Sequence, residues 1–351
     1  MTNTSKAAVL FELDRPLKIV DLIIPNLKPG QVLVDIEYSG VCHTQLNEVR
    51  GLKGEDRFLP HTLGHEGSGV VLEIGKGVEK VKPGDHVVLS WLKGCGADIP
   101  ATTYMSNGEE INSGAISSFM QKAVISENRL TAIPKEMPLK LAALLGCAVP
   151  TGAGVVFNTA KLEVNQTIAI FGAGGIGMSA LLAASSVGAA KIIVVDIVEN
   201  KLLKAMELGA THVINASLVN PLSEIRRLTN MQGVDVSMEC TGKVSVMNDA
   251  YEAARGGGGI CIIAGNPPRG EMMSVNPFSL IGGKKLVGTW GGESNIDLDI
   301  PRYINMFLSG ELALQNMGTS EYSLEEVNDA LNDLESGSIV RAILRMKKIE
   351  G

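Results

Sequence analysis

The feature that most constrains the fold is a regular alternation of strand-like and helix-like segments that begins at Thr167. Between apolar, β-branched strand segments lie stretches with helical character, such as 200–208 and 221–231. Strands that alternate with helices in this way form a parallel sheet with helices on both faces. The sequence therefore predicts an α/β domain with a doubly wound parallel sheet. Its six expected strands are 167–172, 191–196, 212–214, 234–239, 259–264 and 285–288.

A glycine-rich turn follows the first expected strand and has the pattern G-x-G-x-x-G. Such a pattern is weak evidence alone, but here a strand precedes it and a helix of small residues, 178–187, follows it. In this context the second glycine lets a pyrophosphate approach the backbone, and the N-terminus of the helix supplies free N–H groups. We therefore expect the turn to bind a dinucleotide. It reads Gly172-Ala173-Gly174-Gly175-Ile176-Gly177.

An acidic residue at the end of the next strand indicates which dinucleotide binds. Asp196 follows Gly177 by 19 residues, at the place of a carboxylate that takes the ribose hydroxyls of adenosine. A carboxylate there would repel the additional phosphate of NADP, so the sequence favours NAD. Lys201 could reach the same ribose; the alternative is an ordinary solvated lysine on a helix.

The first 148 residues have a different pattern, in which short strand-like runs alternate with turns. The clearest runs are 32–37, 69–74 and 86–89, and Pro-Gly pairs punctuate them. An irregular all-β domain follows from this pattern. Beyond the last strand of the parallel sheet, a helix over 323–334 and a strand over 339–346 continue no further repeat, so we expect them to return to the first domain.

The net charge of the chain and the length of its apolar stretches argue against some classes of binding partner. The net charge is −7 and no stretch is strongly basic, which argues against a nucleic-acid or anionic-membrane surface. The longest apolar stretch, 174–190, is shorter than the ~20 residues that span a bilayer. Charged residues also interrupt the N-terminal segment where the apolar core of a secretion signal would lie. We expect a soluble cytoplasmic protein.

Three scattered residues form a candidate metal site. Cys42, His65 and Cys147 offer two thiols and an imidazole, a set that suits zinc with a fourth position open for water or substrate. The spacing alone does not decide, because a free cysteine is more often a small buried apolar group. The five cysteines of the chain are an odd number and widely spread, a poor basis for a disulfide framework.

The sequence around these residues resembles the medium-chain, zinc-dependent alcohol dehydrogenases over nearly the whole chain. The segment 64–78 is similar to the zinc signature of that family, and Cys42-His43-Thr44 and 146–152 match its other two ligand segments. The glycine pattern, Asp196 and 337–341 fall in the expected order. The resemblance implies a GroES-like catalytic domain, formed by 1–148 with 289–351, and a Rossmann NAD-binding domain over 149–288.

The resemblance also implies a reaction and the residues that perform it. The reaction is reversible hydride transfer between an alcohol and NAD, which gives an aldehyde or a ketone. Cys42, His65 and Cys147 would bind one catalytic zinc, with Glu66 as an exchanging ligand, and Thr44 would hydrogen-bond the substrate hydroxyl. Toward the cofactor, the family assigns the pyrophosphate to His43 and Arg341, and the nicotinamide to Thr151 and Ile176.

Three positions depart from the family pattern. The segment that often carries four cysteines for a structural zinc, 91–101, contains only Cys95, so we expect no structural zinc. The histidine that often ends the proton relay is Asn47, which cannot accept and release a proton near neutral pH. Gln45 stands where an acid often contacts the zinc-binding histidine, and its amide oxygen could still accept the other N–H of His65.

The substrate and the assembly remain open at this level. The positions that line the substrate pocket in the family are Trp91, Phe119, Asn266 and Trp290, each of which could instead belong to the core. Alternatives to a simple alcohol dehydrogenase are a polyol or sugar-derivative dehydrogenase, a zinc-free quinone or enoyl reductase, and a non-enzymatic dinucleotide-binding module. The family implies a homodimer or homotetramer, and the strand at 285–288 is a plausible pairing edge.

Overall fold

The computed structural model describes residues 4–347, which form two compact units. Within the described residues, the first unit comprises 4–147, 295–308 and 319–347, and the second comprises 148–294 and 309–318. The expected domains assigned all of 289–351 to the first unit, whereas 289–294 and 309–318 pack with the second. Contacts explain this difference: Ser294 Oγ donates to the carbonyl of Pro150 at 2.8 Å, and Met317 lies against Ser179.

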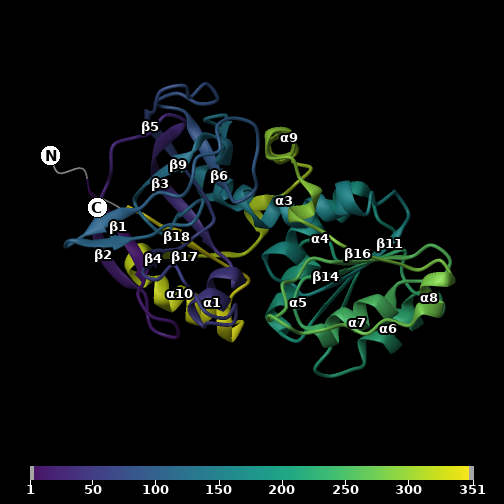
Figure 1. Ribbon diagram of the computed structural model, residues 1–351. Coiled ribbons are helices and arrows are strands. Elements are labelled where there is room, and N and C mark those ends of the chain that lie inside the picture. The colour runs from purple at the N-terminus through teal and green to yellow at the C-terminus, as the bar shows by residue number, and fades with distance from the viewer. Residues whose placement is uncertain (1–3, 348–351) are drawn as a thin grey trace. The chain divides into compact units, whose positions relative to one another are not determined.

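The second unit contains the predicted parallel sheet, with strand order β13-β12-β11-β14-β15-β16. All five strand pairs are parallel, and β11 aligns Thr167 with Lys191 of β12. Helix α4 lies on one face, and α6, α7 and α8 lie on the other (Figure 1). The doubly wound fold is confirmed. The strands are β11 (Thr167–Phe171), β12 (Lys191–Asp196), β13 (His212–Asn215), β14 (Val236–Glu239), β15 (Ile260–Ile263) and β16 (Lys285–Gly288).

The helices of the second unit begin and end at recognisable signals. At the start of α6, the side chain of Asn220 accepts from the backbone N–H of Ser223, and Pro221 occupies the first turn. Helix α6 ends at Leu228, earlier than expected, because Asn230 and Met231 have positive φ values of 50° and 66°. The helices are α3 (Ala148–Gly154), α4 (Gly175–Val187), α5 (Glu199–Glu207), α6 (Pro221–Leu228), α7 (Val244–Ala253) and α8 (Pro277–Ile281).

The first unit is built from two β-sheets and short helices, as the irregular strand pattern predicted. One sheet has the order β4-β1-β2-β7-β8; the other has the order β10-β6-β5-β3-β18-β17, with β9 also paired to β3. The strands are β1 (Thr4–Leu10), β2 (Lys18–Ile23), β3 (Gln31–Val41), β4 (His61–Thr62), β5 (Glu66–Ile74), β6 (His86–Ser90), β7 (Tyr104–Ser106), β8 (Glu109–Ile111), β9 (Lys122–Ser126), β10 (Leu130–Ile133), β17 (Thr319–Ser323) and β18 (Arg341–Arg345). The helices are α1 (His43–Val49), α2 (Leu139–Ala142), α9 (Ile296–Leu308) and α10 (Val327–Ser336).

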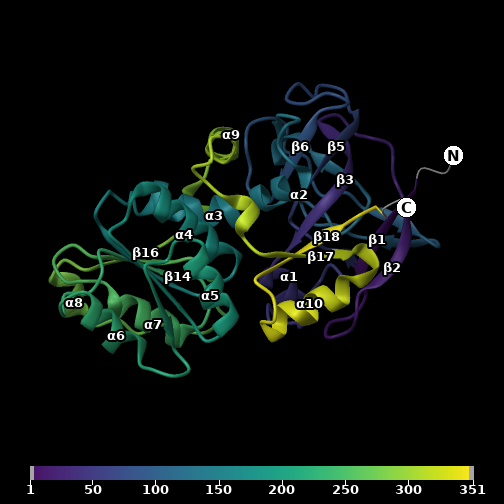
Figure 2. The ribbon, with the colours of Figure 1, turned by 180° about the vertical axis from the view of Figure 1, so that it is seen from behind.

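The end of the chain returns to the first unit, as expected. Strand β18 pairs antiparallel with β3, aligning Ala342 with Val41, and α10 packs against β18 (Figure 2). The expected helix over 323–334 is only partly correct, because Ser323 still belongs to β17. The side chain of Glu326 accepts from the backbone N–H and the hydroxyl of Ser323, so this pair ends the strand and starts the helical segment.

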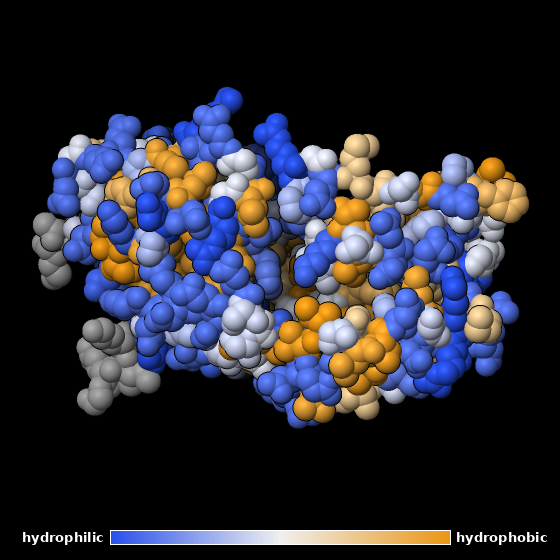
Figure 3. Space-filling model, turned by 90° about the horizontal axis from the view of Figure 1, so that it is seen from below, coloured by the Kyte–Doolittle hydropathy of each residue, from blue (hydrophilic) through white to orange (hydrophobic). Residues whose placement is uncertain are grey.

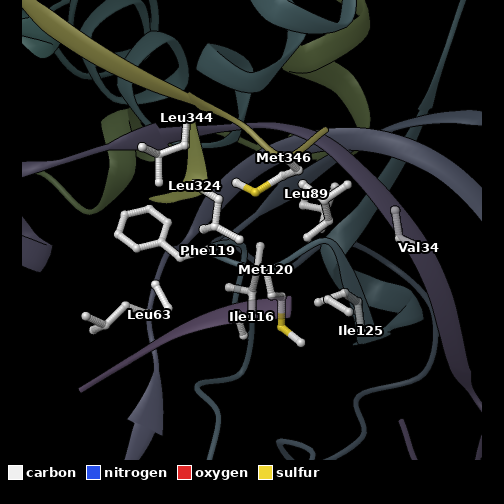
Figure 4. Packing of buried hydrophobic residues seen from close by; sticks show 14 of the residues in the cluster. Val34, Leu63, Leu89, Ile116, Phe119, Met120, Ile125, Leu324, Leu344 and Met346 are labelled. Atoms are coloured by element: carbon white, nitrogen blue, oxygen red, sulfur yellow. The ribbon is translucent and has the colours of Figure 1, made fainter. Parts of the chain in front are cut away.

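The core of the first unit is mainly aliphatic. Leu89, Leu324 and Met346 come from distant parts of the chain and meet there, with Phe119 and Met120 among them (Figure 4). Phe119 is fully buried in this cluster. The side chain that was expected in the substrate pocket thus packs into the core cluster in this structure.

No single helix within residues 4–347 is long and apolar enough to cross a membrane. Two consecutive helical segments, Leu139–Gly146 and Ala148–Thr159, reach that length and composition only when they are taken together.

Candidate active site

The three candidate zinc ligands, which are far apart in the sequence, lie together in the first unit. Cys42 follows β3 at the start of α1, His65 directly precedes β5, and Cys147 ends the first segment of the unit. Their ligand atoms lie within 4.8 Å of one another, and Nε2 of His65 is 3.2 Å from Sγ of Cys147. Two sulfurs and one imidazole nitrogen fit zinc and leave a fourth position for a substrate oxygen.

The surroundings of Cys42 favour its thiolate. Hydrogen bonding with Cys147 holds the pKa of the Cys42 thiol well below its usual range, although burial acts in the opposite direction. His65 and the positive charge of Arg341 lower the pKa further. A thiolate is the form that binds a metal ion, so the site is prepared for a cation.

One amide connects two members of this triad. Oε1 of Gln45 accepts from the backbone N–H of Cys42 at 3.1 Å, and Nε2 of the same side chain lies 2.5 Å from Nδ1 of His65. Gln45 is buried on the first turn of α1. The amide oxygen, which was expected to accept the N–H of His65, is thus bonded to Cys42, and the amide nitrogen faces the ring instead. This contact with the outer nitrogen of His65 holds the ring so that Nε2 faces the sulfur of Cys147.

A buried ion pair lies beside the triad. The carboxylate of Glu66, the residue after His65, pairs with the guanidinium of Arg341 on β18. Glu66 is fully buried and Arg341 is 3% exposed. The guanidinium that was expected at the cofactor pyrophosphate is thus engaged by Glu66 in this structure. Each of these two buried charges stabilises the other, because a single unpaired charge at this position would strongly destabilise the fold.

A cavity of ≈240 Å³ opens next to His65 in the first unit. Thr44 and Trp91, which were expected around the substrate, both line it. Asn266 and Trp290 lie in the second unit, and Trp290 is 73% exposed. The full lining is Thr44, Gln45, Glu48, Lys53, His61, Thr62, Leu63, Gly64, His65, Trp91, Gly114, Ala115, Ile116 and Arg129.

Sequence reasoning missed several charged residues of this cavity. Glu48 and Lys53 form an ion pair at 3.1 Å, and Nε2 of His61 lies 2.8 Å from the carboxylate of Asp56. Arg129 lies after β9 and is 8% exposed. Of these residues, only Glu48 could have been predicted from sequence, because it lies four residues after Thr44 and so on the same face of one helix. Lys53, His61 and Arg129 come from separate segments.

Two other residues of α1 lie outside this lining: His43, which was expected at the cofactor pyrophosphate, and Asn47, which stands at the position of the relay histidine. His43 is exposed at the start of α1, and Asn47 is half-buried one turn later. Asn47 therefore does not restore the proton relay that a histidine at this position would provide.

The glycine-rich turn of the second unit has the features that a dinucleotide requires. Gly172 has φ +101°, a conformation that side chains disfavour. A Cβ on Gly177 would collide with the carbonyl oxygen of Gly172, so only glycine allows the helix to begin this close to the strand. At Gly174, by contrast, a Cβ would meet nothing within 4 Å. This open space at the N-terminus of α4 fits a pyrophosphate.

Asp196 organises the same turn. One of its carboxylate oxygens accepts from the backbone N–H of Ala173 at 2.7 Å, and the other accepts from Ile197 and Val198. It also lines a cavity of ≈90 Å³ at the carboxyl ends of the parallel strands, the usual position for an adenosine. Lys201 does not line this cavity and is buried on α5.

Two residues expected at the nicotinamide lie near each other in the second unit. Helices α3 and α4 pack so closely that a Cβ on Gly152 would collide with the carbonyl oxygen of Ile176. Thr151, the neighbour of Gly152, is buried, and its hydroxyl has no hydrogen-bond partner among residues 4–347. A buried hydroxyl without a partner fits a group that bonds to a bound cofactor.

Carboxylates, rather than a set of thiols, hold the loop around Cys95. The side chain of Glu127 accepts from the backbone N–H groups of Glu79, Lys80 and Ala97 at 2.6–2.9 Å. Asp297 accepts from the backbone N–H of Cys95 at 2.6 Å. These bonds fix the loop around Cys95.

Comparisons with known proteins agree with this geometry. The family described as "Alcohol dehydrogenase GroES-like domain" matches residues 28–135, and the family "Zinc-binding dehydrogenase" matches 175–309. The S-(hydroxymethyl)glutathione dehydrogenase of Paracoccus denitrificans is 32% identical over 97% of this chain and 99% of its own.

Two solved structures share the fold. The alcohol dehydrogenase zinc-binding domain protein from Burkholderia ambifaria is 34% identical, with a TM-score of 0.91 over 98% of this chain and 99% of its own. The benzyl alcohol dehydrogenase from Acinetobacter calcoaceticus is 30% identical, with a TM-score of 0.89 over the same shares of the two chains.

Proposed function

Because this chain belongs to the medium-chain, zinc-dependent alcohol dehydrogenase family, we propose that Cys42, His65 and Cys147 hold a catalytic zinc ion beside the cavity at Thr44. The chain is an oxidoreductase that acts on the CH–OH group of an alcohol with NAD. The observation that carries the proposal is that the cavity is lined by both His65 and Thr44. A hydroxyl bound there would meet a zinc ligand and a hydrogen-bonding side chain together.

The residues of the first unit would bind the alcohol and hold its hydroxyl. When bound, zinc acts as a Lewis acid that makes the hydroxyl of the alcohol more acidic. Thr44 would accept the hydrogen bond of the substrate hydroxyl, and Gln45 would keep His65 in its ligating orientation. Trp91 and Ile116 would exclude water from the carbon that loses the hydride.

The residues of the second unit would bind NAD, which accepts the hydride. Gly174 leaves space for the pyrophosphate, Asp196 would bind the adenosine ribose, and Thr151 with Ile176 would contact the nicotinamide. The negative charge of Asp196 would disfavour the 2′-phosphate of NADP.

The test is NAD⁺ reduction by the purified chain with a panel of alcohols. The panel spans aliphatic, aromatic and allylic alcohols, polyols and sugar derivatives, and formaldehyde mixed with glutathione. Zinc content is measured in parallel for the wild type, Cys42→Ser and the matched control Cys95→Ser. We expect activity and about one zinc per chain in the wild type and in Cys95→Ser, and the loss of both in Cys42→Ser.

Two results would contradict the proposal. A wild-type chain that binds no zinc after purification yet reduces quinones or enoyl groups would belong to the zinc-free reductases. A Cys42→Ser variant that lacks zinc but keeps full alcohol oxidation would remove the metal from the reaction. Preference for polyols, with zinc required, would keep the chemistry and assign the chain to the polyol branch.

We further propose that the chain assembles with a second copy through β16. This strand is the last of the parallel sheet, and Phe278 and Ile281 on the neighbouring α8 are 77% and 80% exposed. Figure 3 shows that apolar patches interrupt an otherwise hydrophilic surface. Light scattering of the wild type should give a dimer, or a tetramer of two such dimers. Phe278→Lys with Ile281→Lys should shift the mass toward the monomer, whereas an unchanged mass would exclude this edge.

A further inference from the structure

We propose that Arg129 makes the cavity beside the zinc ligands a subsite for an anion, so that the substrate is an alcohol that also carries a carboxylate. This inference rests on the proposed function, because the hydroxyl end of the substrate would lie at Thr44 and His65. It goes further in assigning the chemistry of the other end of the molecule.

The first argument is the isolation of a buried positive charge. Arg129 is 8% exposed, and the one hydrogen bond that it makes within residues 4–347 runs from Nη1 to the carbonyl oxygen of Trp91. No carboxylate of the described chain lies within 4.0 Å of its guanidinium. Asp98 acts on Arg129 from a greater distance and is itself paired with Lys93 at 2.6 Å. A buried cation without a direct partner is costly unless a ligand supplies the opposite charge.

The second argument is that the other charges of the cavity are already compensated. Glu48 is paired with Lys53, and His61 contacts the carboxylate of Asp56. Arg129 is therefore the lining charge that lacks a direct ion pair within residues 4–347. A guanidinium has a planar set of donors that matches a carboxylate, and the donors other than Nη1 remain available for it.

The third argument is the shape and composition of the cavity. Thr44 and His65 line it together with Arg129, while Trp91, Leu63 and Ile116 supply apolar walls. A ligand that suits this lining has a hydroxyl, an apolar body and an anionic group. The volume of ≈240 Å³ lies just below the range of about 300–1,000 Å³ that is typical of ligand pockets, so it suits a small ligand. Short ω-hydroxycarboxylates and hydroxymethylbenzoates have this composition.

The experiment compares acids with neutral alcohols of the same length and shape. ω-Hydroxycarboxylates of increasing chain length are tested against the corresponding n-alkanols, and para-(hydroxymethyl)benzoate against para-methylbenzyl alcohol. The zinc-loaded wild type should favour the acids in kcat/KM. Arg129→Met should lower kcat/KM for the acids by about ten- to a hundred-fold and leave the neutral alcohols nearly unchanged. Arg129→Lys should recover part of the loss, because it keeps the charge.

Two controls separate charge recognition from a structural role. Arg15→Met removes an exposed arginine that pairs only weakly with Glu12, and it should change neither class of substrate. Thermal unfolding shows whether Arg129→Met is folded, since the variant also loses the bond to the carbonyl of Trp91. If Arg129→Met lowers kcat/KM equally for acids and neutral alcohols, Arg129 only supports the loop and the proposal is overturned.

Binding measurements distinguish failure of this inference from failure of the proposed function. Hexanoate and hexanol are titrated into zinc-loaded wild type and Arg129→Met by calorimetry, without turnover. Hexanoate that binds the wild type and loses affinity in Arg129→Met supports the subsite even if no alcohol of the panel is oxidised. Equal binding of hexanoate to both proteins, or none to the wild type, overturns the subsite and leaves the dehydrogenase assignment intact.

Discussion

The side chain of Gln45 bridges the backbone N–H of Cys42 and the outer ring nitrogen of His65, so a single neutral amide orients two of the three metal-binding residues. Removing this amide should loosen the site without removing a ligand. We expect Gln45→Ala to lower zinc affinity by about ten- to a hundred-fold, the usual effect of losing such a contact. Competition with a chromophoric chelator measures the affinity directly.

A matched substitution tests the reason for that effect. Gln45→Glu keeps the length of the side chain and supplies an oxygen that accepts the N–H of His65, so it should bind zinc at least as well as the wild type. If Gln45→Ala and Gln45→Glu both bind zinc like the wild type, the amide has no part in the metal site.

Two glycines of the dinucleotide turn should respond in opposite ways to the same methyl group. Gly177→Ala should destabilise the second unit, because the new Cβ would collide with the carbonyl oxygen of Gly172. Gly174→Ala should leave the unit folded and weaken NAD binding, because its Cβ would point into the open space that we assign to the pyrophosphate. Thermal unfolding and NAD titration of both variants separate the two effects. Normal NAD affinity in a folded Gly174→Ala would refute the assigned position of the pyrophosphate.

Replacement of Asp196 should change the preference between the two nicotinamide cofactors. Asp196→Ser removes the charge that repels a 2′-phosphate, so we expect the ratio of kcat/KM for NAD to that for NADP to fall at least about tenfold, or 1.4 kcal/mol. The loss of its bonds to Ala173, Ile197 and Val198 should also weaken NAD binding. Lys201→Met serves as a comparison, and an increase in its KM for NAD would show that the lysine reaches the ribose. An unchanged ratio in Asp196→Ser would contradict the role of the carboxylate.

The loop around Cys95 should be sensitive to acid through Glu127. Burial alone would raise the pKa of Glu127, but hydrogen bonds from the backbone N–H groups of Ala97, Lys80 and Glu79 outweigh it and hold the pKa below its usual value. The stabilisation is then complete above the unfolded pKa of about 4.3 and is lost as the pH falls through the lower folded pKa. Glu127→Gln should cost about 1.5–3 kcal/mol at neutral pH and less in acid.

Chemical denaturation of Glu127→Gln and wild type at pH values from neutral to about 3, below the reference pKa, checks this behaviour. Cys95→Ser is the control, because its side chain is exposed and it should not alter stability. A difference between Glu127→Gln and wild type that stays constant with pH would show that the charge of Glu127 is unimportant.

The repeating part of the fold was predictable from sequence because its signals are local. Each strand of the parallel sheet is a short apolar run, and burial on both faces requires such a run. The end of α6 was misplaced because the backbone of Asn230 and Met231 adopts positive φ. These residue types can adopt positive φ, but their presence in a sequence does not predict it. The burial of Phe119 could not be predicted for a different reason. Its position along the chain resembles a pocket position, but the direction of its side chain depends on how the sheets pack.

The metal triad could be predicted only through motifs, since 23 and 82 residues separate its members. The carboxylates of Glu127 and Asp297 that hold the Cys95 loop had no such motif. The same is true of Arg129, which is one polar residue in an ordinary strand-to-strand connection. Its significance comes from burial and from the absence of a nearby carboxylate in the described chain, and both are properties of the packed structure.

The pairing of β18 with β3 has a consequence for how the protein is made. A ribosome completes the whole second unit before it adds the strand that contacts β3 and brings Arg341 to Glu66. During translation, Cys42 and His65 are therefore made long before the first unit receives β18 and the charge that compensates Glu66. A truncated chain that ends just before residue 341 would contain the whole second unit, but its first unit would lack the strand that lies between β3 and β17. Such a chain would be a natural target for cellular quality control.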